Sequence, residues 1–234
     1  LKVINKLTTM LTTLWNVINI DKDFYVANVV IRSIADNVAL LFLIYDKDEG
    51  EIRILRHYLF LLDGIRSRLA NIIMPIKNDD VTEDEYQKLI KQQEDFKSML
   101  NDCKKNIIEC ITSLKIYNTN KLGIDMLMKN KKGEELYNWK FKTLNIVPSQ
   151  INTEKNTYNW KSMYSEIKLP EKFFSSFLSD YVHGLSMSNI TIAPDKQNMG
   201  TLVYITKVLM ERIELFVRKY YAIELKDIKK NTKQ

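Results

Sequence analysis

Apolar residues recur every three or four positions along most of this chain, which is the spacing of one face of an α-helix. Residues 1–18 show this pattern first. The next stretch, which ends at about Tyr45, is apolar on nearly every side, so we expect a largely buried helix. Asp21 stands just before it and is a suitable N-terminal cap. The pattern therefore predicts two helices before the first charged turn.

That turn, residues 46–51, leads into a third apolar stretch. We expect a helix from about Ile52 to Met74, ended by Pro75, because proline cannot continue a helix. Two apolar helices joined by so short a turn favour antiparallel packing. The second and third helices are therefore predicted to form a hairpin.

The longest helix is predicted from about residue 82 to Ile116. Thr82 is a natural cap, and Glu85, three residues later, completes a capping box. One stripe of the helix carries Leu89, Phe96, Met99, Leu100, Cys103, Ile107, Ile111 and Leu114. At 1.5 Å per residue, the helix would be about 50 Å long.

Residues 117–158 break this regularity, with Asn, Thr, Gly and Lys clusters and one proline. We predict an irregular excursion with short helices near 125–128 and 134–141, lying over the mouth of a site. Helices are expected to resume at 160–167, at 170–183 and at about 199–221.

Only 6 glycines and 4 prolines occur in 234 residues, which favours long helices with few turns. We therefore predict an all-α bundle of about six or seven helices. The whole chain, 1–234, is expected to be a single domain with 117–158 as a loop-rich insertion.

The net charge of +6 permits contact with RNA or an anionic surface without requiring it. The basic stretches, Lys129–Lys132 and Lys226–Lys233, have no interleaved aromatic residues, so solvated loops and termini are the simpler interpretation. Cys103 and Cys110 are seven positions apart on one helix, too far for a mutual disulfide. We expect them to be small core residues in a reducing compartment.

Arg32 and Asp36 interrupt the most apolar stretch, so we expect no membrane span. The chain starts without an initiator methionine or a signal-peptide pattern. We interpret it as a cytoplasmic protein trimmed at its N-terminus.

A polar stripe marks the second helix, where Asn28, Arg32 and Asp36 recur every four positions. An arginine and an aspartate on a buried helix need partners, because unpaired burial is costly. This stripe is the clearest candidate site in the chain. The alternative is that the Arg32–Asp36 pair is simply satisfied within the core.

The chain has two histidines. His57 lies near the start of the third helix, and His183 closes the predicted helix at 170–183, where Gly184 suits a C-cap. The helix dipole stabilises a charged histidine at that position, which is a structural reason for it. The alternative is a general acid–base or an anion ligand.

The Arg32-x-x-x-Asp36 helix, the late segment Ser179-Asp-Tyr181-Val-His183-Gly184 and the long terminal helix resemble bacterial all-helical families of unknown function. These families look like distant relatives of the HEPN superfamily, which includes toxin and phage-defence ribonucleases. The resemblance implies an all-helical fold and metal-independent RNA cleavage. The usual Arg-x(4–6)-His motif is missing here, since no arginine precedes His183 at that spacing.

On that hypothesis His183 is the general acid or base, and Arg32 stabilises the charge that develops on the phosphate. Asp36 orients one of them, and Ser179 or Tyr181 adds a hydrogen bond. No nucleotide-binding glycine loop, nucleophile elbow or metal-ligand spacing occurs in the sequence, so we expect no metal and no cofactor.

Two functions remain. The first is an interaction or regulatory module of a bacterial defence or stress system, which binds a protein partner or forms a homodimer. The alternative is a HEPN-like ribonuclease that uses Arg32 and His183 on RNA. The ribonuclease requires Arg32, Asp36 and His183 to meet in an accessible cleft.

Overall fold

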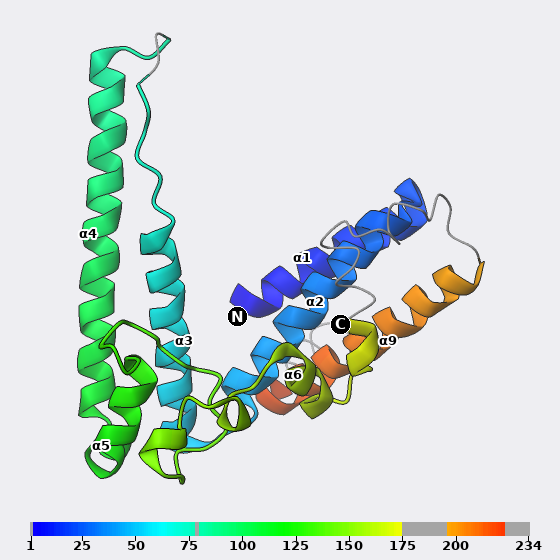
Figure 1. The fold of residues 1–234 in the computed structure, drawn as a ribbon. Coiled ribbons are helices and arrows are strands. Elements are labelled where there is room, and N and C mark those ends of the chain that lie inside the picture. Colours follow the sequence, from blue (N-terminus) through cyan, green and yellow to red (C-terminus); the bar gives the residue numbers. More distant parts are fainter. Residues whose placement is uncertain (1, 78–79, 175–195, 223–234) are drawn as a thin grey trace, which may run out of the picture. The chain divides into compact units, whose positions relative to one another are not determined.

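The computed structural model describes residues 2–77, 80–174 and 196–222 (Figure 1). Within these residues there are seven α-helices and no strand longer than an isolated bridge. The all-α, multi-helix prediction is confirmed. The chain divides into two compact units, one made of Leu1–Leu43 with Asn159–Gln234 and the other of Ile44–Tyr158. The single-domain boundary stays a prediction.

The first unit begins with α1 (Lys2–Asn16), which continues into a π-helical turn, Val17–Asp21. Lys22 ends that turn in the left-handed conformation, with φ at +53°. The following helix, α2 (Phe24–Tyr45), is capped by Asp23, whose Oδ1 accepts a hydrogen bond from the Val26 amide at 3.0 Å. The predicted cap at Asp21 is therefore wrong by two residues, because the π-turn carries the first helix further than expected.

Most of α2 is buried, as predicted. Its fully buried side chains include Ile31, Ile34, Ala35 and Val38. By length and composition alone α2 could cross a membrane, even though it contains Arg32 and Asp36. The expectation of no membrane span therefore stays a prediction. However, 56% of the relevant window is buried inside the protein, as in the core helix of a soluble protein.

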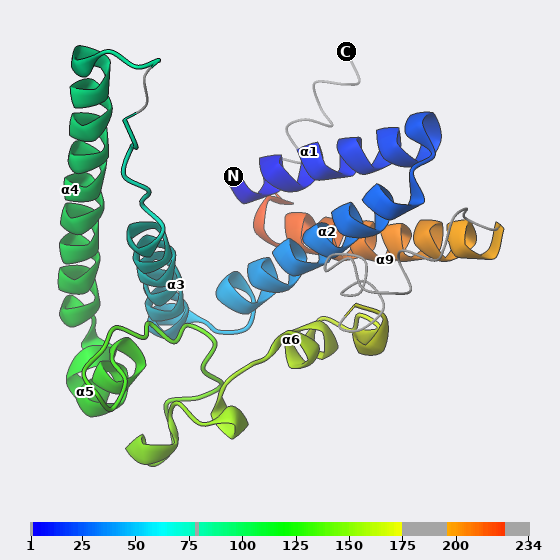
Figure 2. The same cartoon turned by 45° about the horizontal axis from the view of Figure 1, so that its top comes forward.

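Two further helices complete the described part of this unit, α6 (Trp160–Glu166) and α9 (Lys196–Tyr220). Both agree closely with the predicted ranges. Asn159 caps α6 by accepting a hydrogen bond from the Ser162 amide. Helices α1, α2 and α9 lie side by side in both views (Figures 1 and 2). Phe42 of α2 contacts Phe216 of α9, with ring centroids 5.7 Å apart.

The second unit contains α3 (Gly50–Ala70), α4 (Glu83–Ser113) and α5 (Lys115–Met128). Helix α3 ends four residues before Met74, because Asn71 bonds back to the Ser67 carbonyl and Pro75 disfavours helix in the residue before it. The capping box of Thr82 and Glu85 is confirmed.

Helix α3 packs against α4 and α5. The predicted hairpin of the second and third helices stays a prediction, since α2 lies almost wholly in the first unit and α3 in the second. Leu114, in extended conformation, separates α4 from α5. The Glu51 carboxylate of α3 then accepts hydrogen bonds from the amides of Lys115 and Ile116 and so caps α5.

The irregular excursion is shorter than predicted, because residues 117–128 belong to α5. The expected helix at 134–141 is wrong. Tyr137 has a φ of +49° there, which is incompatible with a right-handed helix. Instead, isolated bridges join Lys129 to Glu135 and Phe141 to Thr157, and two short 3₁₀ turns, Pro148–Gln150 and Glu154–Asn156, complete the segment.

Candidate functional site

The polar stripe of α2 contains one completely buried amide. The Asn28 side chain has no exposed surface, and its Nδ2 donates to the Phe24 carbonyl at 2.8 Å. Its Oδ1 is buried without a hydrogen-bond partner among the described residues. An unpaired buried acceptor is unfavourable, so the environment of Asn28 is not fully satisfied.

Arg32 and Asp36 form the ion pair that their spacing predicts. Nε of Arg32 donates to Oδ1 of Asp36 at 3.0 Å. The Arg32 side chain is 13% exposed and that of Asp36 28% exposed. Nη1 of Arg32 is buried and has no hydrogen-bond partner among the described residues.

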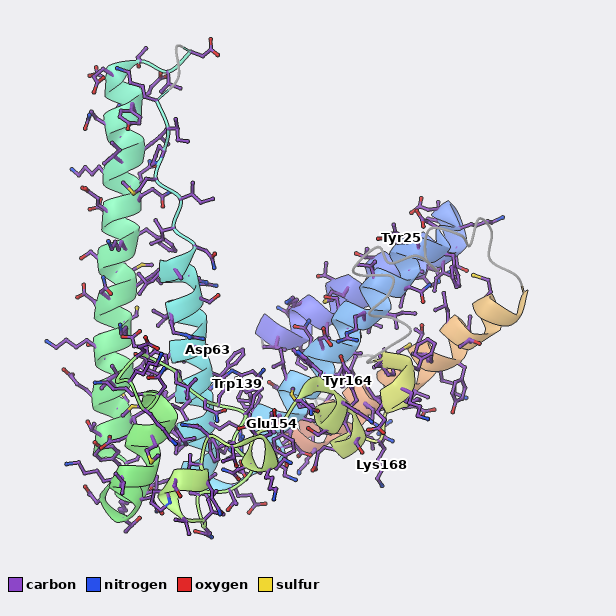
Figure 3. All side chains as sticks on the ribbon, viewed as in Figure 1. Tyr25, Asp63, Trp139, Glu154, Tyr164 and Lys168 are labelled. Carbon is purple, nitrogen blue, oxygen red and sulfur yellow. The ribbon has the colours of Figure 1, made fainter. Side chains whose placement is uncertain are left out.

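Tyr164 of α6 joins this pair. Its hydroxyl donates to Oδ1 of Asp36, and the guanidinium carbon of Arg32 lies 5.2 Å from the centre of its ring. Burial raises the pKa of Tyr164, and the hydrogen bond to Asp36 raises it further. The phenol therefore stays protonated and acts as a donor. The cluster links α2 to α6 (Tyr164 is labelled in Figure 3).

This geometry limits what the cluster can do chemically. Asp36 accepts hydrogen bonds from both Arg32 and Tyr164 through one oxygen, so it fixes the orientation of the arginine. Among the described residues, Nη1 of Arg32 is the buried donor of the cluster that has no hydrogen-bond partner. The cluster connects α2 to α6. Within the described residues it leaves one buried donor, Nη1 of Arg32, and one buried acceptor, Oδ1 of Asn28, without a hydrogen-bond partner.

The structure brings together Arg32 and Asp36, with Asn28 one turn before them. His183, Ser179 and Tyr181 lie outside the described residues, so the convergence of Arg32, Asp36 and His183 stays a prediction. Tyr164 is not predictable from the sequence. Its partner is 128 residues away, and no spacing rule links positions so far apart.

A second buried arginine was also missed. Arg56 of α3 is completely buried and is bound to the Asp48 carboxylate through Nε, at 2.8 Å, and through Nη2. Its Nη1 donates to the carbonyls of Trp139 and Phe141, both at 2.7 Å. Burial lowers the pKa of Arg56, while the Asp48 carboxylate raises it. Four of the five donors are used, so this site is structural.

His57, the one histidine within the described ranges, lies beside Arg56 in sequence. Its Nδ1 is 3.1 Å from the Tyr45 hydroxyl, and burial lowers its pKa. Trp139 is fixed nearby by a hydrogen bond from Nε1 to Oδ2 of Asp63 at 3.0 Å (Figure 3). The Trp139 bond attaches the irregular segment to α3, and the His57 contact joins α3 to the last residue of α2.

The cysteines are not core residues, since Cys103 and Cys110 are both free thiols on the exposed surface of α4. The prediction was wrong because the buried side of α4 passes through Leu100 and Ile111, and the cysteines lie at its edge. No known family model, curated protein or solved structure matches this chain.

Proposed function

We propose that this protein is a helical interaction module, which binds a partner helix through one exposed line of α4. Leu89, Phe96, Cys103 and Cys110 follow each other at intervals of seven residues. Leu89 is 43% exposed and Phe96 38%, and both cysteines are exposed. Met99 lies beside this line and is 50% exposed. We call these five residues the α4 strip.

A seven-residue repeat of apolar side chains is the pattern by which one helix packs along another. Leu100 and Ile111, which lie next to this line on α4, are already buried in the second unit, and Cys110 at the end of the line hydrogen-bonds with Tyr58 of α3. From Leu89 to Met99 the α4 strip therefore presents exposed apolar surface beside the buried side of the helix. Contiguous exposed apolar surface of this kind marks interaction sites in soluble proteins.

The α4 strip is tested by placing a photo-crosslinking amino acid at position 96 of the full chain in the producing cell. Irradiation is expected to give a discrete covalent adduct with a protein. A crosslinker at Leu122 is the matched control, since this side chain is apolar and exposed but belongs to α5.

A discrete adduct from position 96, absent from position 122, supports the proposal. The adduct is also expected to disappear when Leu89→Asp is combined with the crosslinker, because a charge in the line removes apolar burial. Adducts of equal yield from both positions, or none from position 96, would overturn it.

The ribonuclease remains a second candidate, favoured by one observation. Arg32 keeps a buried Nη1 group without a hydrogen-bond partner among the described residues, and a phosphate oxygen would satisfy it. Purified protein is incubated with RNA beside the Arg32→Ala and His183→Ala variants. Cleavage that is lost in both variants supports this candidate, whereas equal cleavage by all three proteins, or none by any, contradicts it.

A further inference from the structure

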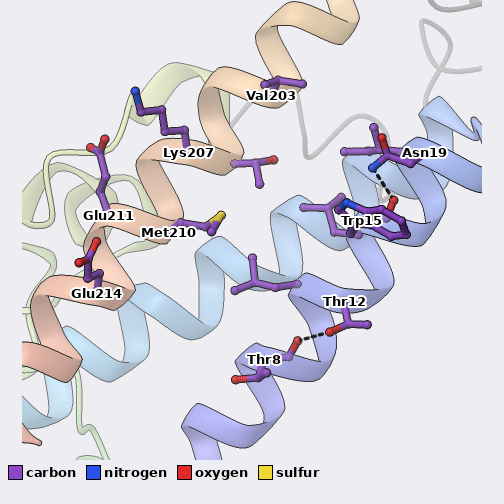
Figure 4. Close-up of a pocket in the computed structure, with 13 residues that line it drawn as sticks. Thr8, Thr12, Trp15, Asn19, Val203, Lys207, Met210, Glu211 and Glu214 are labelled. Carbon is purple, nitrogen blue, oxygen red and sulfur yellow. Dashed lines mark hydrogen bonds between the residues drawn. The ribbon is translucent and has the colours of Figure 1, made fainter. Parts of the chain in front are cut away.

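The first unit has an open groove between α1 and α9, with a volume of about 910 Å³ (Figure 4). Helix α2 passes behind it. Its apolar lining comes from both sides: Leu11, Leu14, Trp15, Ile18, Val203 and Met210. Trp15 is 60% exposed and Met210 52%, so large apolar surfaces face solvent.

The uncharged polar side chains along the groove bind their own helices. Thr8 donates to the Ile4 carbonyl, Thr12 to Thr8, Asn19 to Trp15 and Thr206 to Leu202, at 2.8–3.1 Å. They therefore require no polar ligand. The groove presents mainly apolar surface, so a small polar molecule would bind there only weakly. An amphipathic helix suits such a surface.

Charges on α9 form an ordered row beside the groove. Lys207, Glu211 and Glu214 follow each other at intervals of four and three residues, so they share one flank of the helix. Glu214 pairs with Arg218. Lys207 and Glu211 have no ion-pair partner within the described ranges.

Helix α4 carries the opposite row in reverse order. Asp95, Lys91 and Lys88 are also separated by four and three residues, along one flank of the α4 strip. Antiparallel to α9, this row places a negative charge against Lys207 and a positive charge against each glutamate. No ion pair involves these three α4 residues in the described part of the chain.

We infer that the α1–α9 groove of one copy binds the α4 strip of a second copy, with α4 antiparallel to α9. This rests on the proposed function, with a second copy of the chain as the partner of the α4 strip. Lengths agree: the groove runs from Thr8 to Asn19, about 16 Å, and Leu89 to Met99 spans about 15 Å. Its specificity comes from the facing charge rows, because like charges in the wrong register repel.

Charge exchange tests this pairing in the full chain. Sedimentation velocity is expected to show self-association that rises with concentration. Glu211→Lys and Lys91→Glu are each expected to weaken it roughly three- to tenfold, because each replaces an exposed attractive pair by a repulsive one. The two variants mixed in equal amounts are expected to recover the wild-type association, since every groove then meets a complementary α4.

Lys97→Glu is the matched control, because it changes the net charge equally but lies on the other flank of the α4 strip. Its association is expected to match the wild type. A protein that stays monomeric at every concentration, or association that the charge variants leave unchanged, overturns the inference. If position 96 then crosslinks to a different protein, the proposed function survives without it.

Discussion

Arg32 and Arg56 are both largely removed from solvent, yet they are satisfied to very different degrees. Arg56 places four donors on a carboxylate and two backbone carbonyls, and its guanidinium also lies 4.1 Å from the Phe141 ring centre. Within the described part of the chain, Arg32 makes one hydrogen bond, to a carboxylate that is partly exposed, and its Nη1 has no partner. The difference teaches that burial alone does not mark a functional arginine. A buried arginine is a candidate functional residue when one of its hydrogen-bond donors has no partner.

The largest effect is expected at Arg56. Arg56→Met leaves Asp48 and the carbonyls of Trp139 and Phe141 without their donor, and we expect the free energy of unfolding to fall by about 3–5 kcal/mol. Chemical denaturation measures it. Arg66→Met is the control, because its ion pair with Asp63 is exposed and contributes about 0–1 kcal/mol. A loss at Arg56 no larger than at Arg66 would contradict this assignment.

A smaller effect is expected at Arg32. Arg32→Met removes one ion pair but also removes an unpaired buried donor, so the two terms partly offset each other. We expect a loss of about 1–2 kcal/mol in the same denaturation measurement. Asp36 keeps the hydrogen bond from Tyr164, which limits the cost. A loss equal to that of Arg56→Met would remove the contrast between the two arginines.

The smallest expected effect is a pH dependence of the free energy of unfolding, which comes from His57, next to Arg56 in sequence. Burial lowers the pKa of His57 in the folded protein, so the unfolded chain binds the proton more readily. Stability contributed by neutral His57 is present above the ordinary value of 6.5 and is lost as the pH falls below it. In His57→Gln, the free energy of unfolding is expected to differ less between about pH 7.5 and about pH 5.5. An unchanged difference would exclude His57 as its source.

These contrasts also show what the sequence could predict. Helix ranges followed from apolar spacing and from the capping box of Thr82 and Glu85, because both depend on residues within a few positions. The Arg32–Asp36 pair was predictable for the same reason. Tyr164 and the environment of Arg56 were not, since their partners lie 128, 83 and 85 residues away. The spacing of residues within one helix cannot predict contacts between residues so far apart in the sequence.

The helix at 134–141 failed for a different reason. The apolar spacing there is compatible with a helix, but the backbone instead gives its carbonyls to Arg56 and holds Tyr137 in the left-handed conformation. The prediction that the cysteines are core residues failed because one side of α4 packs against α3, while the adjacent line of side chains is exposed. A stripe in the sequence shows which residues share a side, and only packing shows which side is covered.

The Glu51 cap gives α5 a property that no residue of α5 itself provides. The amides of Lys115 and Ile116 both donate to one carboxylate that belongs to another helix, 64 and 65 residues earlier in the chain. Their hydrogens are therefore shielded from exchange with solvent only while α3 is in place. In a deuterium-exchange experiment the amides of Lys115 and Ile116 should therefore lose protection together, at the rate at which α3 undocks.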